Sequence, residues 1–246
     1  MHIELIGSTS AGKTTLAKKM VEAGKNSGID VSLSDDFILD QLHLGWVKND
    51  FIRRRLVEIV AFGICLTCMS RYQDFLRFVV NEGKSSPGSL FYKFNRVRNV
   101  IRKIGIFEYI SRNSESKQIV LADNEGILQG VHNLFVHRNS QTNLNKIVEY
   151  VELVPLPDIV LYIQQNEEVL ISRTLGRGHA RVARNDPDQV AYFIGQAITV
   201  FNELVSVPKV RERLLIVEDG SKVRTEPGNL FDAKFHRVAE LVQSGC

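Results

Sequence analysis

Five short runs of aliphatic and β-branched residues divide the chain, and each is bounded by turn residues or charge. They are His2–Ile6, Asp30–Ser34, Gln118–Ala122, Asp158–Ile163 and Arg213–Val217. Patterns with helical spacing lie between them, starting near Lys13, Asn49, Asn95, Asn143, Glu167 and Asp186, and a last one spans about 231–242. Because strands that alternate with helices form parallel sheets, the pattern predicts an α/β fold with a five-stranded parallel sheet and helices on both faces.

The interval between the second and third predicted strands is too long for a simple crossover helix. It contains helical patterns over 49–81 and 90–112, separated by a Gly- and Ser-rich break at 83–89. We therefore expect one domain, 1–246, with a helical insert over about 41–115 that caps one end of the sheet and binds substrate. Arg98 and Arg102 can share one helix face there, which is either a solvated surface or an anion-facing wall of the substrate site.

Composition and charge exclude several classes of protein. Hydrophobic residues make up 44% and charged residues 24%, which excludes a fully disordered chain. A net charge of +3 does not favour a nucleic-acid binder. The longest apolar run is shorter than the ~20 residues that cross a bilayer, and no basic leader region opens the chain, so we expect a cytoplasmic protein without membrane contact. Cys65 and Cys68 have no partner pair for a zinc site and are expected to be buried thiols.

Residues 7–14, Gly-Ser-Thr-Ser-Ala-Gly-Lys-Thr, match the phosphate-binding pattern G-x-x-x-x-G-K-[ST] between a strand and a helix. Two glycines allow successive N–H groups to turn inward, and the helix directs its N-terminus at the same anion. We expect Lys13 to bind the phosphates of ATP and the Thr14 hydroxyl to bind Mg²⁺. The expected nucleotide contacts are Gly7, Ser8, Thr9, Ser10, Ala11, Gly12, Lys13, Thr14 and Thr15.

This loop, the five strands and an arginine-rich segment before the last strand resemble the P-loop small-molecule kinases, including uridine-kinase-like, thymidylate-kinase-like and deoxynucleoside-kinase-like enzymes. The resemblance covers the sheet and its loops but hardly touches the insert. It implies the strand order 2-3-1-4-5. It also implies transfer of the γ-phosphoryl group of Mg-ATP to a nucleoside, nucleotide or other small-molecule acceptor.

The residues after the second strand, Ser-Asp-Asp-Phe at 34–37, resemble the Asp-Asp-Phe of uridine-kinase-like enzymes. A carboxylate at this edge of a sheet can deprotonate an acceptor hydroxyl, so we expect Asp35 or Asp36 to be the base and favour Asp35. Asp is also common at helix starts, so capping is the structural alternative. Trp46 resembles an aromatic residue that packs on the base in deoxynucleoside kinases, but it could equally belong to the core of the insert.

Two further segments carry the resemblance. Asp123 and Glu125, in Asp-Asn-Glu-Gly at 123–126, resemble the acid that holds Mg²⁺ through water, and the intervening Asn leaves open which of the two is equivalent. The segment 172–187 resembles the lid of these kinases, in which Arg173, Arg177 and Arg181 would neutralise the transferring phosphoryl group. A strand-end turn and a solvated basic loop are the respective structural alternatives.

Other classes of function remain open from the sequence. A P-loop NTPase could act as a conformational switch through a protein partner, although the chain lacks the Asn-Lys-x-Asp motif of GTPases. The altered acidic motif would also fit a nucleotide-binding protein that has lost catalysis. Sulfotransferases are disfavoured, because a complete G-x-x-x-x-G-K-T is unusual in them. The apolar stretch at 57–69 fits a homodimer formed through the insert.

Overall fold

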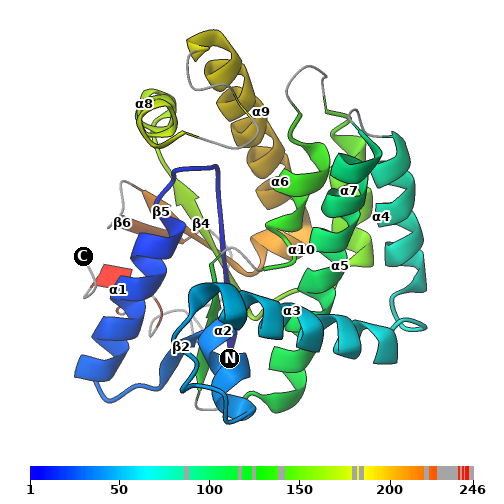
Figure 1. The fold of residues 1–246 in the computed structure, drawn as a ribbon. Coiled ribbons are helices and arrows are strands. Elements are labelled where there is room, and N and C mark those ends of the chain that lie inside the picture. Colours follow the sequence, from blue (N-terminus) through cyan, green and yellow to red (C-terminus); the bar gives the residue numbers. More distant parts are fainter. Residues whose placement is uncertain are drawn as a thin grey trace.

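A six-stranded sheet forms the centre of the molecule in this computed structural model (Figure 1). The structure describes residues 1–85, 89–115, 118–123, 126–137, 142–178, 182, 186–218, 222–225, 238, 240, 242 and 243. The strands are β1 (His2–Ile6), β2 (Val31–Leu33), β3 (Ile119–Ala122), β4 (Ile159–Gln164), β5 (Leu214–Glu218) and β6 (Lys222–Thr225). Their spatial order is β2-β3-β1-β4-β5-β6, and β1 to β5 are parallel. The expected fold class and the order 2-3-1-4-5 are therefore confirmed.

The sixth strand, β6, was not expected from the sequence. It runs antiparallel to β5, with Leu215 opposite Thr225 and Glu218 opposite Lys222. An antiparallel strand can follow its neighbour through a tight connection, whereas a parallel strand needs a crossover of a dozen or more residues. The short interval after β5 therefore has room for this strand, although four residues are too few to give a clear periodic signal.

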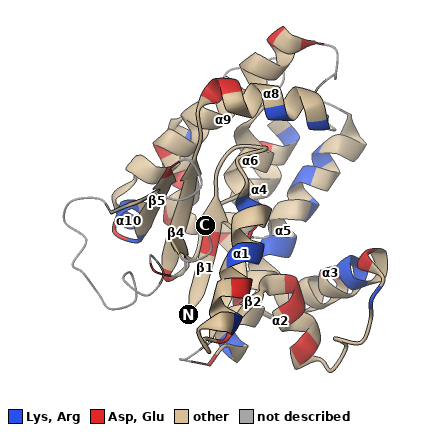
Figure 2. Cartoon of the chain, turned by 90° about the vertical axis from the view of Figure 1, so that its left-hand side faces the viewer, with Lys and Arg blue, Asp and Glu red and all other residues tan. Residues whose placement is uncertain are grey.

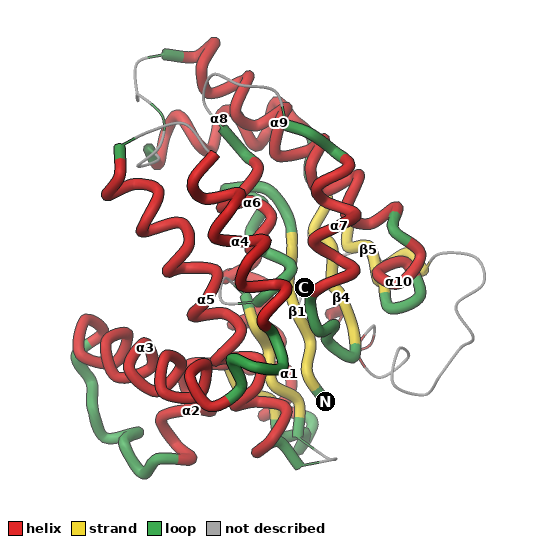
Figure 3. The backbone as a smooth tube through the Cα atoms, turned by 90° about the vertical axis from the view of Figure 1, so that its right-hand side faces the viewer, coloured by secondary structure: helices red, strands yellow, loops and turns green. Residues whose placement is uncertain are grey.

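The helices lie on both faces of the sheet. They are α1 (Lys13–Asn26), α2 (Ser34–Gln41), α3 (Asp50–Thr67), α4 (Gln73–Ser85), α5 (Leu90–Asn113), α6 (Gly130–Phe135), α7 (Asn145–Leu153), α8 (Glu167–Arg177), α9 (Pro187–Ser206) and α10 (Pro208–Arg211). Helix α1 covers one face, and α5, α6, α7 and α9 cover the other (Figures 1 and 3). The helix predicted at about 231–242 lies largely outside the described residues, but Val238 and Val242 are fully buried in the core.

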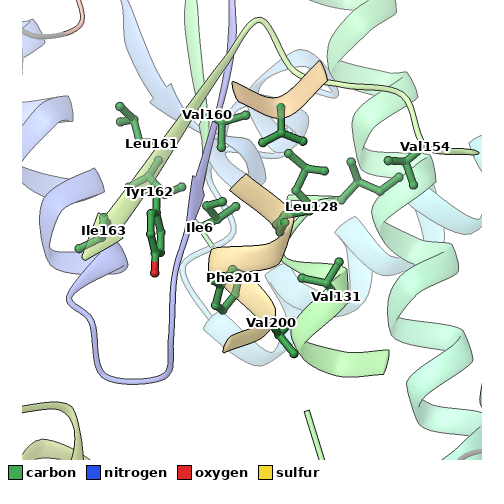
Figure 4. Close-up of a cluster of buried hydrophobic side chains, with 14 of the residues drawn as sticks. Ile6, Leu128, Val131, Val154, Val160, Leu161, Tyr162, Ile163, Val200 and Phe201 are labelled. Carbon is green, nitrogen blue, oxygen red and sulfur yellow. The ribbon is translucent and has the colours of Figure 1, made fainter. Parts of the chain in front are cut away.

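Helix α9 shows how the apolar pattern determines this packing. Asp186 caps its start by accepting a hydrogen bond from the Gln189 N–H, and Pro187 occupies its first turn. Its buried residues recur at helical spacing and form one apolar face. Val200 and Phe201 on that face lie beside Ile6 of β1 and Tyr162 of β4 (Figure 4). The two strands that lead into the site are thus held by a continuous core.

The segment 41–115, which we expected to form a helical insert, contains α3, α4 and α5. The second half of α5 is buried from Lys103 to Ile110, and the ring centroids of Phe107 and His2 are 5.2 Å apart. This half of α5 therefore serves as the crossover from the insert back to β3. Helix α3 crosses α5 on the outside of the molecule (Figure 3).

Cys65 and Cys68 are buried free thiols, as expected. Burial raises the pKa of the Cys65 thiol to about 11, so little reactive thiolate forms at neutral pH. Among the helices of the described part of the chain, none is long and apolar enough to cross a membrane.

The crossing of α3 and α5 depends on Gly105. A Cβ atom at this position would lie 1.8 Å from the backbone oxygen of Ala61, so Gly105→Ala must push the two helices apart. We expect it to lower the free energy of unfolding by about 2 kcal/mol or more. Gly63→Ala, at an exposed position of α3 with no atom near the added Cβ, should instead raise it by about 0.5–1 kcal/mol. Urea unfolding measures both, and equal effects would contradict this packing.

Candidate active site

The phosphate loop connects β1 to α1 at the C-terminal edge of the sheet. Gly7 and Gly12 adopt φ angles of 145° and 97°, which side chains disfavour. A Cβ atom at Gly7 would also lie 2.8 Å from the backbone oxygen of Ile163 in β4. The first glycine is therefore required both by its backbone angle and by the close approach of the neighbouring strand.

Lys13 points into the centre of this loop. Its ammonium donates hydrogen bonds to the backbone oxygens of Gly7 (2.9 Å) and Ser8 (2.8 Å), and its side chain is buried. Burial lowers the pKa of Lys13 to about 8, although the nearby Asp123 carboxylate opposes the shift. Two neutral carbonyls are weak partners for a buried cation, so phosphate oxygens would be a favourable replacement.

Thr14 and Asp123 meet at the entrance of the loop. The Thr14 hydroxyl donates to Oδ2 of Asp123 at 2.8 Å, which brings together two of the expected metal ligands from the start of α1 and the end of β3. Glu125, the other expected ligand, lies outside the described residues. Within the described part of the chain, no three His, Cys, Asp or Glu side chains cluster around a common point. One hydroxyl and one carboxylate fit Mg²⁺, because this ion keeps several waters and takes further ligands from phosphates.

Helix α8 brings two arginines to the phosphate loop. Arg173 donates from Nη1 to the Ser10 oxygen at 3.5 Å, and Thr174 donates its hydroxyl to Oγ of Ser10 at 3.1 Å. A cavity of about 490 Å³ lies between the helix and the loop. It is lined by Ser10, Ala11, Gly12, Thr15, Leu16, Lys19, Ile163, Gln165, Arg173 and Arg177. Arg181 and most of the expected lid after Gly178 lie outside the described residues.

The two candidate bases lie in the first turn of α2, directly after β2. Asp36 forms an ion pair with Arg53 of α3. The side chain of Asp35 is partly buried, and its Oδ1 atom is shielded from solvent. Figure 2 shows that acidic residues mark α2 and that basic residues recur along α5. Of the two candidate bases, Asp36 is therefore engaged with α3, whereas Asp35 has a carboxylate oxygen shielded from solvent.

The other expected substrate residues lie in different surroundings. Trp46 is 74% exposed, so the alternative that it belongs to the core of the insert is wrong. It follows α2 in a short connection whose few contacts leave the ring in solvent. Arg98 pairs with Glu58 at 3.2 Å, so its charge is partly neutralised. Arg102 lies one turn further along α5, and its Nε atom is buried.

Two functional candidates were missed in the sequence, Glu4 and Gln129. The carboxamide of Gln129 accepts a hydrogen bond from the Gly7 N–H and donates one to the Gly7 oxygen, both at 3.2 Å. Glu4 of β1 accepts from the Gln129 N–H at 2.7 Å. The sequence signal for Glu4 was its place as the single acidic residue in the apolar run of the first strand. Gln129 lies in a segment without any motif, so no sequence signal pointed to it.

Glu4 is fully buried under the phosphate loop. Burial raises the pKa of Glu4 to about 7, while the N–H group of Gln129 and the charge of Lys103 act in the opposite direction. Lys103 comes from α5, and Tyr150 of α7 lies on the same side, where its hydroxyl donates to the Ile127 oxygen at 2.6 Å. Glu4 is therefore bonded to the turn before α6 and lies near the charge of Lys103 of α5.

No family model and no curated protein matches this chain. Three solved structures of deoxyadenosine kinase from M. mycoides are similar to it. The structure with dCMP and dCDP has a TM-score of 0.44 at 14% identity, covering 88% of this chain and 90% of the other. The dATP complex has a TM-score of 0.42 at 14% identity and covers 98% of this chain and 97% of the other. The dCTP complex has a TM-score of 0.38 at 13% identity and covers 98% of this chain and 96% of the other.

The buried Glu4 predicts a pH-dependent stability. Its pKa is about 7 when folded and near 4.5 when unfolded, so between these values the folded chain keeps a proton that the unfolded chain loses. Its contribution to the free energy of unfolding therefore falls as the pH rises from about 5 to 7. Glu4→Gln should gain stability relative to wild type between pH 5 and pH 8 in urea unfolding. A difference between Glu4→Gln and wild type that stays constant with pH would contradict the prediction.

Proposed function

We propose that this protein is an ATP-dependent phosphotransferase that moves the γ-phosphoryl group of Mg-ATP to a small-molecule acceptor. The observation that carries the proposal is the convergence of Lys13, the bonded pair Thr14 and Asp123, and Arg173 around one loop. These groups supply the positive charge and the metal ligands that phosphoryl transfer requires. The acceptor is a nucleoside, a nucleotide or another metabolite with a hydroxyl or phosphate group.

The phosphate loop and α8 would bind the nucleotide. The N–H groups of residues 7–15 and the Lys13 ammonium would hold its phosphates, and the cavity beside Arg173 and Arg177 would hold its remaining part. Thr14 and Asp123 would hold Mg²⁺, which neutralises charge on the phosphates when bound. The guanidinium groups of α8 would stabilise the negative charge of the transferring group.

Asp35 is the proposed general base. It follows β2 at the carboxyl edge of the sheet, where open α/β folds bind their ligands. Asp36 is paired with Arg53, so its carboxylate is engaged with α3. We propose that Asp35 takes the proton of an acceptor hydroxyl. The ion pair between Asp36 and Arg53 would instead hold α2 against α3.

Replacing Lys13 tests the proposal most directly. Lys13→Met keeps the length of the side chain and removes the charge, so we expect ADP formation to fall about 100-fold or more. The assay measures ADP release from Mg-ATP with nucleosides, nucleoside monophosphates, sugars or antibiotic alcohols, and without an acceptor. Release that depends on one acceptor class supports a kinase. Steady release without any acceptor would favour the NTPase switch, and an unaffected Lys13→Met would refute the site.

The two acids of α2 should differ in their effects. Asp35→Asn removes the proposed base and should lower kcat about 100-fold with the acceptor identified in the panel. Asp36→Asn leaves Asp35 in place and should lower kcat much less, although it loses the ion pair with Arg53. Circular dichroism checks that both variants fold. Equal losses in the two variants, or none in the double variant, would overturn this assignment.

We also propose that two copies of the chain pair through α3. Ile59 and Leu66 are seven residues apart on this helix and are 68% and 71% exposed, whereas Val57 and Ala61 face the core. Exposed apolar side chains at heptad spacing form a stripe that a second copy of the same helix can cover across a two-fold axis.

This pairing predicts a concentration-dependent dimer. The double variant Ile59→Glu and Leu66→Glu places charges in the stripe and should sediment as a monomer at concentrations where the wild type is dimeric. Val148→Glu, at a half-exposed position of α7, is the control and should leave the dimer intact. A monomeric wild type at high micromolar concentration in analytical ultracentrifugation would rule out the pairing.

A further inference from the structure

A tightly packed turn, residues 126–130, leads into α6 and includes its first residue. Gly126 lies directly against Glu4, since a Cβ atom there would be 2.1 Å from the Cγ and Cδ atoms of that side chain. Gly130 lies against Tyr150, whose hydroxyl oxygen would be 2.4 Å from an added Cβ. The same hydroxyl bonds to the Ile127 oxygen. The turn is therefore fixed at both ends by buried polar side chains from β1 and α7.

The turn holds the phosphate loop through one side chain. Gln129 is 8% exposed, and its carboxamide binds both polar groups of the Gly7 residue, the N–H and the carbonyl. Its own N–H donates to the Glu4 carboxylate, which prevents the turn from moving away from the loop. At 2.7 Å, this bond is shorter than the two 3.2 Å bonds between Gln129 and Gly7. The position of the first loop glycine thus depends on Glu4 through Gln129.

The Gly7 carbonyl has a second donor, and this donor has to leave when phosphate binds. Lys13 bonds to the oxygens of Gly7 and Ser8 and would turn toward the phosphates of a nucleotide. A buried carbonyl that loses its only donor costs about 1–3 kcal/mol. Because Nε2 of Gln129 also donates to the Gly7 oxygen, that oxygen keeps a partner after Lys13 has moved.

From this geometry we infer that Glu4 and Gln129 are positioning residues that hold the phosphate loop open for nucleotide and allow Lys13 to leave the Gly7 carbonyl. The inference rests on the proposed nucleotide site but adds residues outside the phosphate-loop motif. Neither side chain needs to touch the nucleotide. Their effect reaches the ligand through the backbone of Gly7 and the side chain of Lys13.

Binding of Mg-ADP, measured by isothermal titration calorimetry, tests the inference without knowledge of the acceptor. Gln129→Leu keeps the approximate volume but loses both bonds to Gly7, so we expect the Kd to rise about tenfold or more. Glu4→Leu removes the acceptor of the Gln129 N–H and should weaken binding similarly. Glu4→Gln keeps an acceptor oxygen and should lose less affinity than Glu4→Leu, which is the rescue that a purely packing role would not produce.

Gln196→Leu is the matched control. The Gln196 carboxamide also joins two groups, since it accepts from the His137 N–H and donates to the Tyr192 hydroxyl, but it lies on α9 away from the loop. We expect it to lower the unfolding midpoint without changing the Kd. All titrations are made at a temperature at which circular dichroism shows each variant to be folded.

The outcomes separate this inference from the proposed function. If the wild type binds no Mg-ADP, the nucleotide site itself is refuted. If the wild type binds and folded Gln129→Leu binds equally well, the positioning role is wrong while the site stands. Equal losses of affinity in Gln129→Leu and Gln196→Leu would likewise overturn the role, because they would reflect general destabilisation.

Discussion

The site depends on a buried ammonium group. Lys13 carries its charge inside a loop whose nearest partners are two backbone carbonyls, and burial lowers its pKa to about 8. A buried cation at such a position is destabilising unless an anion pairs with it. The loop can hold this charge only because its backbone is rigid, and the rigidity comes from the strands and helices around it rather than from the loop sequence.

Strand β4, helix α9 and the turn before α6 supply that rigidity. Strand β4 lies so close to Gly7 that no side chain fits there, and α9 packs behind both central strands. The turn before α6 binds the Gly7 peptide through Gln129, and Glu4 holds that turn from below. A buried carboxylate and a buried ammonium on either side of one peptide group are each unfavourable alone. Between them, Lys13 bonds to the Gly7 oxygen, Gly7 bonds to the Gln129 carboxamide and the Gln129 N–H bonds to Glu4.

The side of the candidate site that α2, α3 and α5 form is built differently. Helices α2, α3 and α5 bring acids and arginines together through ion pairs, of which Asp36 with Arg53 and Arg98 with Glu58 are examples. Ion pairs at partly exposed positions are weak and adjustable.

The local sequence determined the elements and the phosphate loop. Strand and helix periodicity predicted all five parallel strands, and the spacing of Gly7, Gly12 and Lys13 predicted the loop, because these signals arise from neighbouring residues. Contacts between distant segments were decided only by the tertiary structure. The antiparallel β6, the exposure of Trp46, the pairing of Arg98 and the bond from Gln129 to Gly7, 122 residues apart, are of this kind. Chain periodicity reports which face of an element is buried, whereas the partner across that face depends on how all the elements pack together.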